Sequence, residues 1–236
     1  MESEQRYLDG SYFAANPTFH AEDSPWKAGQ IAKMLERHQS SPQSVCEVGC
    51  GAGEILVQLQ RRYPQIDRLH GYEISPQGYA LALQRQNDKL KFFNADLFTA
   101  QQARYDLMLC IDVFEHVENY FDFLRNLRGH ADNFIFHIPL DMNVQMIWRA
   151  KPISRVRHEV GHLHYFSKET AFATLSETGY DIQDWFYTPG GSERPQSVKA
   201  RLAALPRQLA TRISRDLAVR VLGGYSLLVY ASPKAR

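Results

Sequence analysis

The stretch Val45-Cys46-Glu47-Val48-Gly49-Cys50-Gly51-Ala52-Gly53-Glu54 decides the fold of this chain. Its first four residues are typical of the end of a short buried strand, and the residues from Ile55 onward are typical of a helix. Three glycines at alternate positions lie between them. Because glycine has no Cβ atom, the main chain there can turn tightly and a ligand can approach it closely. The following helix start also offers unpaired backbone N–H groups. We therefore expect a strand–turn–helix unit whose turn holds a ligand, provided that suitable side chains follow at the right distance.

Beyond this unit, apolar runs alternate regularly with helical patterns. We expect further strands at 68–74, 90–95, 105–111, 134–139, 180–187 and 225–230, and helices at 55–63, 75–87, 119–128 and 167–179. The run 105–111 is almost continuously apolar, which is typical of a central strand covered on both faces. An earlier helix should begin with Ser24 as N-cap and Pro25 at its first position. The alternation predicts an α/β fold with a parallel sheet.

The composition is that of an ordinary globular protein. The 236 residues are 44% apolar and 22% charged, with a formal net charge of +1, so we expect one domain over 1–236 and no nucleic-acid partner. Three cysteines without a CxxC pair indicate neither a disulfide framework nor a zinc knuckle. The N-terminus is polar, and no apolar run is long enough to span a bilayer. These features favour a cytoplasmic protein.

Three acidic residues fall at the ends of successive predicted strands: Glu73, Asp96 and Asp112. In an open α/β sheet, ligands bind outside the carboxyl ends of the strands. Glu73 lies 20 residues beyond Gly53, the distance at which a carboxylate accepts hydrogen bonds from ribose hydroxyls. A lone acid in a loop is usually only solvated. Three acids at three strand ends beside a glycine-rich turn predict a nucleoside-binding site instead.

The turn itself argues against a dinucleotide. The dinucleotide fingerprint is G-x-G-x-x-G, but here the third glycine comes one position early, and Glu54 occupies the place of the last glycine. A carboxylate at that helix start would repel a pyrophosphate. Glu47, at the end of the preceding strand, suits a cationic amine.

At these residues the sequence resembles the class I S-adenosylmethionine-dependent methyltransferases. The stretch from Glu47 to Gly53 resembles their motif I, Glu73 matches the acid that ends their second strand, and 94–97 matches their adenine-side motif. The segments 106–117 and 161–170 resemble the branch that includes quinone-biosynthesis and many small-molecule methyltransferases. The similarity covers 42–190 and the closing strand 225–231. It implies a Rossmann-like, seven-stranded sheet of order 3-2-1-4-5-7-6, with a reversed last strand and helices on both faces.

The resemblance also implies S-adenosylmethionine as the cofactor and a set of residues around it. We expect the cofactor to contact Trp26, Glu47, Gly49, Cys50, Gly51, Gly53, Glu73, Ile74, Asp96, Leu97, Ile111 and Asp112. A hydroxyl or amine acceptor needs a base for its proton, and the candidates are His116, His137, His158, His162 and His164. We favour His116 and His162, which the resemblance places near the methyl end of the cofactor. His137 lies within a strand, where a half-buried, hydrogen-bonded role is more common.

Two alternatives remain open. Asp112, Glu115, His116 and His162 are hard-metal ligand types, and a related group of RNA-tail methyltransferases uses a comparable arrangement. That group begins its motif with Glu, however, and the Asp-x-x-Glu-His string is also common in members without a metal, so we expect none. The second alternative is a non-catalytic or partner-binding protein on the same fold, which fold alone does not distinguish from an enzyme.

The segments outside the core are expected to cover the site. These are an N-terminal arm and helix at 1–41, and insertions at 140–166, interpreted as a long loop, and at 191–224. Within 195–222 an amphipathic helix is expected, with a kink at Pro206 and arginines around an apolar face formed by Leu202, Leu205, Leu209, Ile213, Leu217 and Val221. It is interpreted as a lid over a small-molecule acceptor or as a membrane-surface helix that serves a lipid-linked one. The sequence leaves open the acceptor, the methylated atom (O, N or C) and the oligomeric state.

Overall fold

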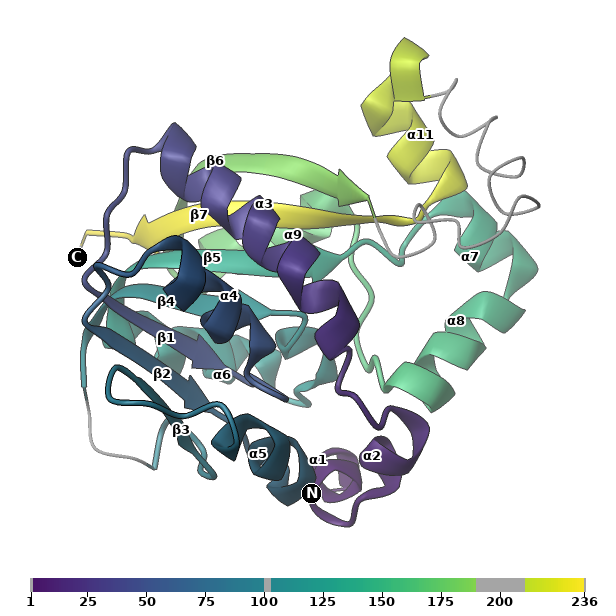
Figure 1. Ribbon diagram of the computed structural model, residues 1–236. Helices are drawn as coiled ribbons and strands as arrows, with labels where there is room; N and C mark the ends of the chain where they lie inside the picture. The colour runs from purple at the N-terminus through teal and green to yellow at the C-terminus, as the bar shows by residue number, and fades with distance from the viewer. Residues whose placement is uncertain (1, 100–102, 190–210, 236) are drawn as a thin grey trace.

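A seven-stranded sheet forms the centre of the protein (Figure 1). The computed structural model describes residues 2–99, 103–189 and 211–235. The strands lie in the order β3-β2-β1-β4-β5-β7-β6, and β7 runs antiparallel to both of its neighbours while the other pairs are parallel. Their bounds are β1 Ser44–Val48, β2 Arg68–Tyr72, β3 Leu90–Phe93, β4 Tyr105–Ile111, β5 Ala131–Pro139, β6 Tyr180–Pro189 and β7 Tyr225–Pro233. The predicted strand order and reversed last strand are confirmed.

Helices cover both faces of this sheet (Figure 1). One face carries α3 (Ser24–Arg37), α4 (Glu54–Arg62) and α5 (Pro76–Leu83), and the other carries α6 (Tyr120–Leu127) and α9 (Lys168–Glu177). Successive residues of β4 point to opposite faces, so Leu109 packs in one core and Met108 in the other. This double coverage is why the sequence of β4 is almost continuously apolar.

Side chains cap several of the helices. Ser75 caps α5 and Ser167 caps α9 with a complete capping box, near the helix starts predicted at 75 and 167. Gly179, at φ +93°, follows the end of α9. The predicted cap of α3 is wrong by one residue, because Ser24 is already helical and Asp23 is the N-cap.

The interpretation of 140–166 as a loop is wrong. The segment contains two short helices, α7 (Val144–Arg149) and α8 (Lys151–Arg155), followed by a π-helical turn, η4 (Val156–Val160). Asn143 caps α7 by accepting a hydrogen bond from the Met146 N–H. Helices of five or six residues are too short to show a helical period of apolar residues, so the sequence pattern did not reveal them.

Only part of the predicted helix at 195–222 can be compared with the structure. Residues 190–210, which include Leu202, Leu205, Pro206 and Leu209, lie outside the described residues. The described part holds α11 (Arg215–Leu222), capped by Ser214. Its apolar side chains Leu217 and Val221 are exposed. None of residues 211–224 lines the main cavity described below, and the interpretation of the insertion as a lid or as a membrane-surface helix stays a prediction.

The N-terminal arm crosses the carboxyl end of the sheet. It consists of α1 (Glu2–Leu8), α2 (Ser11–Ala15) and the short η1 (Ala21–Asp23), and lies between α5 and η4 (Figure 1). The Asn16 side chain donates a hydrogen bond to the Glu159 carbonyl, at 3.3 Å, and the Arg6 guanidinium to the His158 carbonyl, at 3.4 Å. These contacts join the arm to the insertion after β5. In the described part of the chain, no helix is both long enough and apolar enough to cross a membrane.

Candidate functional site

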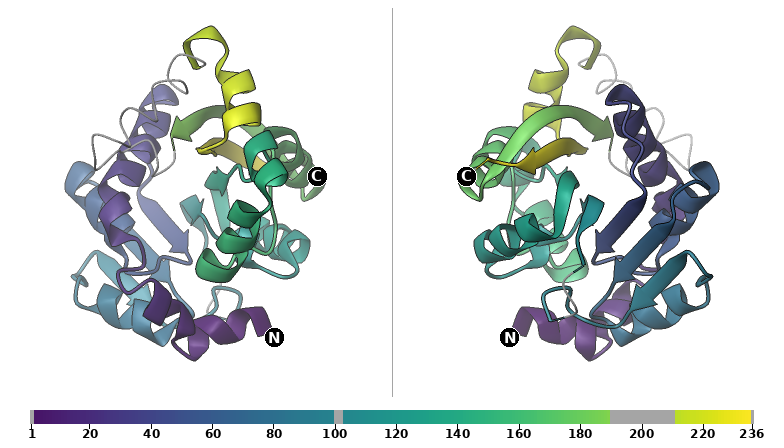
Figure 2. Two further views of the ribbon diagram at one scale, coloured as in Figure 1. Left: turned by 90° about the vertical axis from the view of Figure 1, so that its right-hand side faces the viewer. Right: turned by 90° about the vertical axis from the view of Figure 1, so that its left-hand side faces the viewer.

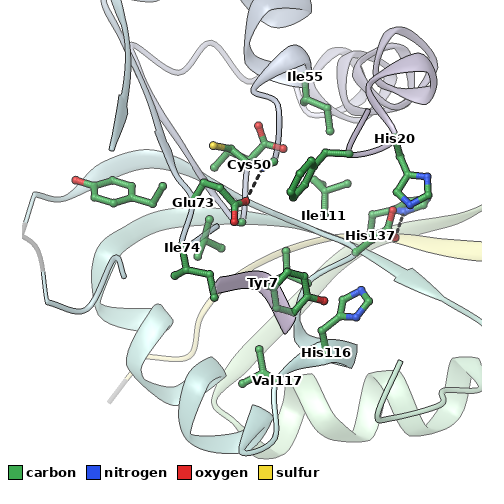
Figure 3. Close-up of a pocket in the computed structure, with 18 of the residues that line it drawn as sticks. Tyr7, His20, Cys50, Ile55, Glu73, Ile74, Ile111, His116, Val117 and His137 are labelled. Atoms are coloured by element: carbon green, nitrogen blue, oxygen red, sulfur yellow. Dashed lines mark hydrogen bonds and ion pairs between the residues drawn. The ribbon is translucent and has the colours of Figure 1, made fainter. Parts of the chain in front are cut away.

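A cavity of about 500 Å³ lies at the carboxyl ends of the central strands (Figure 3). Its size is typical of a small-molecule site. Its walls come from the glycine-rich turn, the ends of β2 and β4, the start of α3 and the N-terminal arm. All the residues expected to contact the cofactor line it except Gly53, and both favoured histidines line it too. The sheet therefore gathers side chains that the sequence spreads over more than 130 positions.

Gly53 has a packing role instead. It is the N-cap of α4 at φ +74°, and a Cβ atom there would lie 2.4 Å from the Phe92 ring. The absence of a side chain lets α4 and β3 approach each other. Glu54, next in the chain, forms an ion pair with Arg85 at 3.0 Å.

The Glu73 carboxylate is held in place by the main chain. One oxygen accepts a hydrogen bond from the Gly51 N–H at 2.8 Å (Figure 3). The other accepts one from the Ser75 N–H, also at 2.8 Å. Burial raises the pKa of Glu73, while these N–H groups act in the opposite direction. Because a carboxylate has about four acceptor positions, two remain for a ligand.

Glu47 is a buried acid, and one of its carboxylate oxygens lacks a hydrogen-bond partner. Its residue is 2% exposed, and its Oε2 atom has no hydrogen-bond partner. Burial raises its pKa to about 8, although the nearby Lys27 ammonium opposes this shift. A buried carboxylate without a partner favours a cationic ligand, since leaving the charge unpaired costs free energy. This environment suits the predicted amine.

The Asp112 carboxylate contacts two side chains within the protein, Lys27 and His137. Its oxygens lie 2.7 Å from Lys27 Nζ and 2.6 Å from His137 Nδ1, and His137 Nε2 lies 2.9 Å from the Thr188 hydroxyl. Burial favours protonated Asp112, but His137 and Lys27 outweigh it and hold the pKa well below its usual range. His137 is buried with both ring nitrogens bonded, as its position in a strand suggested. Sequence reasoning missed Lys27, whose only signal was its place in the first turn of α3.

His116 and His162 form a pair at the other end of the cavity. His116 lies in the short helix η2 (Phe114–His116), and the two ring centroids are 4.9 Å apart in an edge-to-face arrangement. The Nδ1 atom of His116 lies 3.0 Å from the Gly161 carbonyl. A carbonyl can only accept, so Nδ1 carries the proton and Nε2 is left with a lone pair. Burial and the neighbouring His162 lower the pKa of His116 to about 3, which makes it a weak base.

His162 has the stronger base character. Its Nδ1 atom lies 2.6 Å from Asp141 Oδ2. Burial works against the charged imidazolium, but the Asp141 hydrogen bond and the Glu115 carboxylate outweigh it, so the pKa of His162 is raised. A carboxylate that orients one ring nitrogen leaves the other to accept a proton. Sequence analysis did not identify Asp141, because nothing in the pattern of 140–166 linked it to His162.

Glu115 completes a group with metal-ligand chemistry. It is 1% exposed, neither carboxylate oxygen has a hydrogen-bond partner, and burial raises its pKa to about 8. One ligand atom from each of Glu115, His116 and His162 lies within 4.8 Å of the others. The donor set fits a divalent cation such as zinc or manganese. Asp112 does not belong to this group, so the four-residue metal set considered from the sequence reduces to three.

The arm closes the cavity with aromatic side chains. Tyr7, Tyr12 and Phe19 all line it, and the Tyr7 ring lies 6.2 Å from that of His116 (Figure 3). Phe19 packs over the glycine-rich turn, since a Cβ atom at Gly51 would lie 3.3 Å from it. Burial raises the pKa of Tyr12 to about 12, so this phenol stays neutral at physiological pH.

Deleting residues 1–22 should therefore leave the sheet folded but weaken ligand binding. The arm supplies cavity walls, whereas both main cores of the sheet consist of residues from 28 onward. Calorimetric titration of S-adenosylhomocysteine, together with the melting temperature, checks this. A large fall in melting temperature would show that the arm is required for folding and would contradict its role as a cover.

Comparison with known proteins decides the family. A family model described as "Methyltransferase domain" (Methyltransf_23) matches residues 24–184. The chain belongs to this methyltransferase family. It is 24% identical over 110 residues to a ubiquinone biosynthesis O-methyltransferase of Rickettsia felis, a match that covers 45% of each protein. The chain thus spans less than half the length of this curated relative.

Solved structures of methyltransferases share the fold of this family member. Magnesium protoporphyrin IX methyltransferase from Synechocystis PCC 6803, with bound SAH, is 17% identical, with a TM-score of 0.60 over 89% of this chain and 83% of that one. The N-methyltransferase NodS from Bradyrhizobium japonicum WM9, solved with S-adenosylhomocysteine (SAH), is 16% identical to this chain. Its TM-score is 0.58, and the match covers 95% of this chain and 98% of NodS. At these identities the likeness shows the fold alone. The names cover both O- and N-methyl transfer, so they leave the methylated atom of this chain open.

Proposed function

We propose that this protein transfers a methyl group from S-adenosylmethionine to a hydroxyl or amine of a small-molecule acceptor. The observation that carries the proposal is one cavity lined both by the strand-end acids beside the glycine-rich turn and by a histidine that a carboxylate orients. When bound, the cofactor supplies an activated methyl group. The protein then contributes orientation for in-line displacement and a site closed to water. Membership of the family and the names of its relatives support this assignment.

Each end of the cofactor has a chemically matched partner in the cavity. Ribose hydroxyls would donate to the free acceptor positions of Glu73, and the amine would lie near the unpartnered oxygen of Glu47. Lys27, 2.7 Å from Asp112, supplies positive charge for the cofactor's carboxylate. The adenine would lie by Ile74 and Leu97, which both line the cavity.

His162 is the residue we assign as the base. Asp141 fixes its Nδ1–H, so its Nε2 atom can take the proton from the acceptor as the methyl group arrives. His116 would act as a neutral neighbour that shapes the acceptor pocket. This dyad also favours an enzyme over a non-catalytic protein on the same fold, because binding alone does not require an oriented base.

A metal-assisted reaction is the second candidate, and the unpartnered carboxylate of Glu115 favours it. Glu115, His116 and His162 would hold the cation, and the Asp141 contact would orient His162 as a ligand. A cation there would act as a Lewis acid on the acceptor oxygen or nitrogen. His162 could then no longer serve as the base.

We favour a lipid-linked acceptor. We also propose that the protein acts in the cytoplasm. The curated relatives are named for ubiquinone biosynthesis. Many of the residues that line the cavity are aromatic or aliphatic. The three cysteines are free and buried, which fits a reducing compartment. No feature of the cavity calls for a nucleic acid.

A screen of candidate acceptors with radiolabelled S-adenosylmethionine tests the proposal. We expect label to pass to at least one phenol, hydroxyl or amine, and the rate to stay unchanged after treatment with a chelator. Loss of transfer on chelation, restored by one divalent cation, would favour the metal-assisted reaction. Cofactor binding without transfer to any acceptor class would favour the non-catalytic reading.

A further inference from the structure

Exposed apolar side chains gather on one side of the molecule. Among the described residues, every exposed large apolar side chain except Leu8, Leu83 and Phe93 belongs to α7, to α11 or to their immediate neighbours. We call this group the α7–α11 surface, and it consists of Met142, Val144, Ile147, Trp148, Ile213, Leu217 and Val221. Trp148 is 85% exposed and Ile213 is 87% exposed. Scattered apolar residues are normal on a surface, but a cluster of this kind indicates an interaction site.

The two helices form a continuous surface. A small groove between them is lined by Val144, Gln145, Trp148, Arg149 and Val221. Figure 1 shows α7 and α11 on the side of the molecule remote from α5, and the left view of Figure 2 faces that side. Both helices therefore lie on the same side of the molecule.

Polar contacts fix α11 with its apolar side outward. Asp216 accepts hydrogen bonds from Lys168 at 2.6 Å and from Tyr187 at 2.5 Å. Arg220 binds Asp216 and also Glu169 on α9. Because this polar side is bound to α9 and β6, Leu217 cannot turn inward without breaking these bonds. The exposure of the apolar side is thus a fixed property of the fold.

The charges around the α7–α11 surface are positive. The α7 and α11 segments carry four exposed basic residues, Arg149, Lys151, Arg212 and Arg215. The acidic residues described in 141–160 and 211–222 are Asp141, Glu159 and Asp216, and each is already bound to His162, Arg155 or Lys168. In the described part of the chain, no acidic side chain pairs with Arg149, Lys151, Arg212 or Arg215.

We propose that the α7–α11 surface docks onto a lipid bilayer that contains anionic lipids. Trp148 and its aliphatic neighbours would enter the headgroup boundary, where tryptophan is enriched, and the arginines would bind lipid phosphates. Charge favours this partner over a second copy of the chain. In a two-fold dimer the same positive surface would face itself, and like charges repel.

The position of the surface relates the bilayer to the cavity. Asp141, which orients the proposed base His162, is followed directly by Met142, and Val144 begins α7. Docking would thus bring the cavity wall to the membrane, where a lipid-linked acceptor resides. This inference adds a place of action to the proposed methyl transfer, and vesicle binding is measured without the cofactor, so either proposal can fail alone.

Flotation of the full chain with vesicles tests the docking. We expect binding to vesicles of phosphatidylcholine mixed with phosphatidylglycerol, little binding to phosphatidylcholine alone, and weaker binding at high salt. The double variant Trp148→Ser/Leu217→Ser and the double variant Arg212→Glu/Arg215→Glu should each bind at least about tenfold more weakly. The matched control Leu83→Ser alters an exposed leucine on α5 and should bind like the wild type. The melting temperature of each variant shows that it is folded.

Two results would overturn the proposal. One is wild-type protein that does not float with anionic vesicles, or that floats equally well after either double substitution. The other is a dimer in solution that the Trp148→Ser/Leu217→Ser variant abolishes, without vesicle binding by the wild type. The α7–α11 surface would then be a contact between copies of the chain.

Discussion

Replacing His162 with alanine should lower turnover by about 10²–10⁴-fold, the usual contribution of a positioned general base. The structure gives the reason, since the Asp141 carboxylate holds His162 with one ring nitrogen bonded and the other available. His116 cannot take its place, because burial lowers its pKa to about 3. Single-turnover kinetics with the acceptor found in the screen measure the effect, and calorimetry should show almost unchanged affinity for S-adenosylhomocysteine.

Two further variants make this prediction specific. Asp141→Asn should also reduce turnover, by less than His162→Ala, because the ring loses its orienting carboxylate but stays in the cavity. His164→Ala is the matched control, since His164 is two residues away, does not line the cavity and bonds to the Val117 carbonyl. Full turnover by His162→Ala would contradict the assignment of the base. Methyl transfer would then rest on positioning alone.

The sequence was sufficient to predict the parts of the fold that depend on local pattern. The apolar run of β4, the helix starts near 75 and 167 and the strand-end acids all follow from short-range rules. The structure places these acids around one cavity. The strand order required the resemblance to a family, since alternation alone does not specify which strands are neighbours.

The residues that were missed are brought to the site by tertiary structure. Lys27 reaches Asp112 from a helix 85 positions earlier, and Asp141 reaches His162 across a segment interpreted as a loop. The packing contact of Gly53 with Phe92 was likewise not visible in the sequence, where this glycine only matched a binding motif. The sequence indicated an apolar side of α11 but not which way it faces, since its outward orientation depends on the polar bonds of Asp216.

We propose above that this cavity binds S-adenosylmethionine, with Glu73 as the partner of the ribose. Calorimetric titration of S-adenosylhomocysteine into the wild type and into Glu73→Ala tests it most directly. Hydrogen bonds to a charged group contribute about 1.5–3 kcal/mol, so we expect the dissociation constant of the variant to rise by about 10- to 150-fold. The melting temperature of the free variant monitors the loss of the Gly51 and Ser75 contacts, and NAD⁺ should not bind. Equal affinity in the two proteins, no binding by the wild type, or tight binding of NAD⁺ would contradict the account.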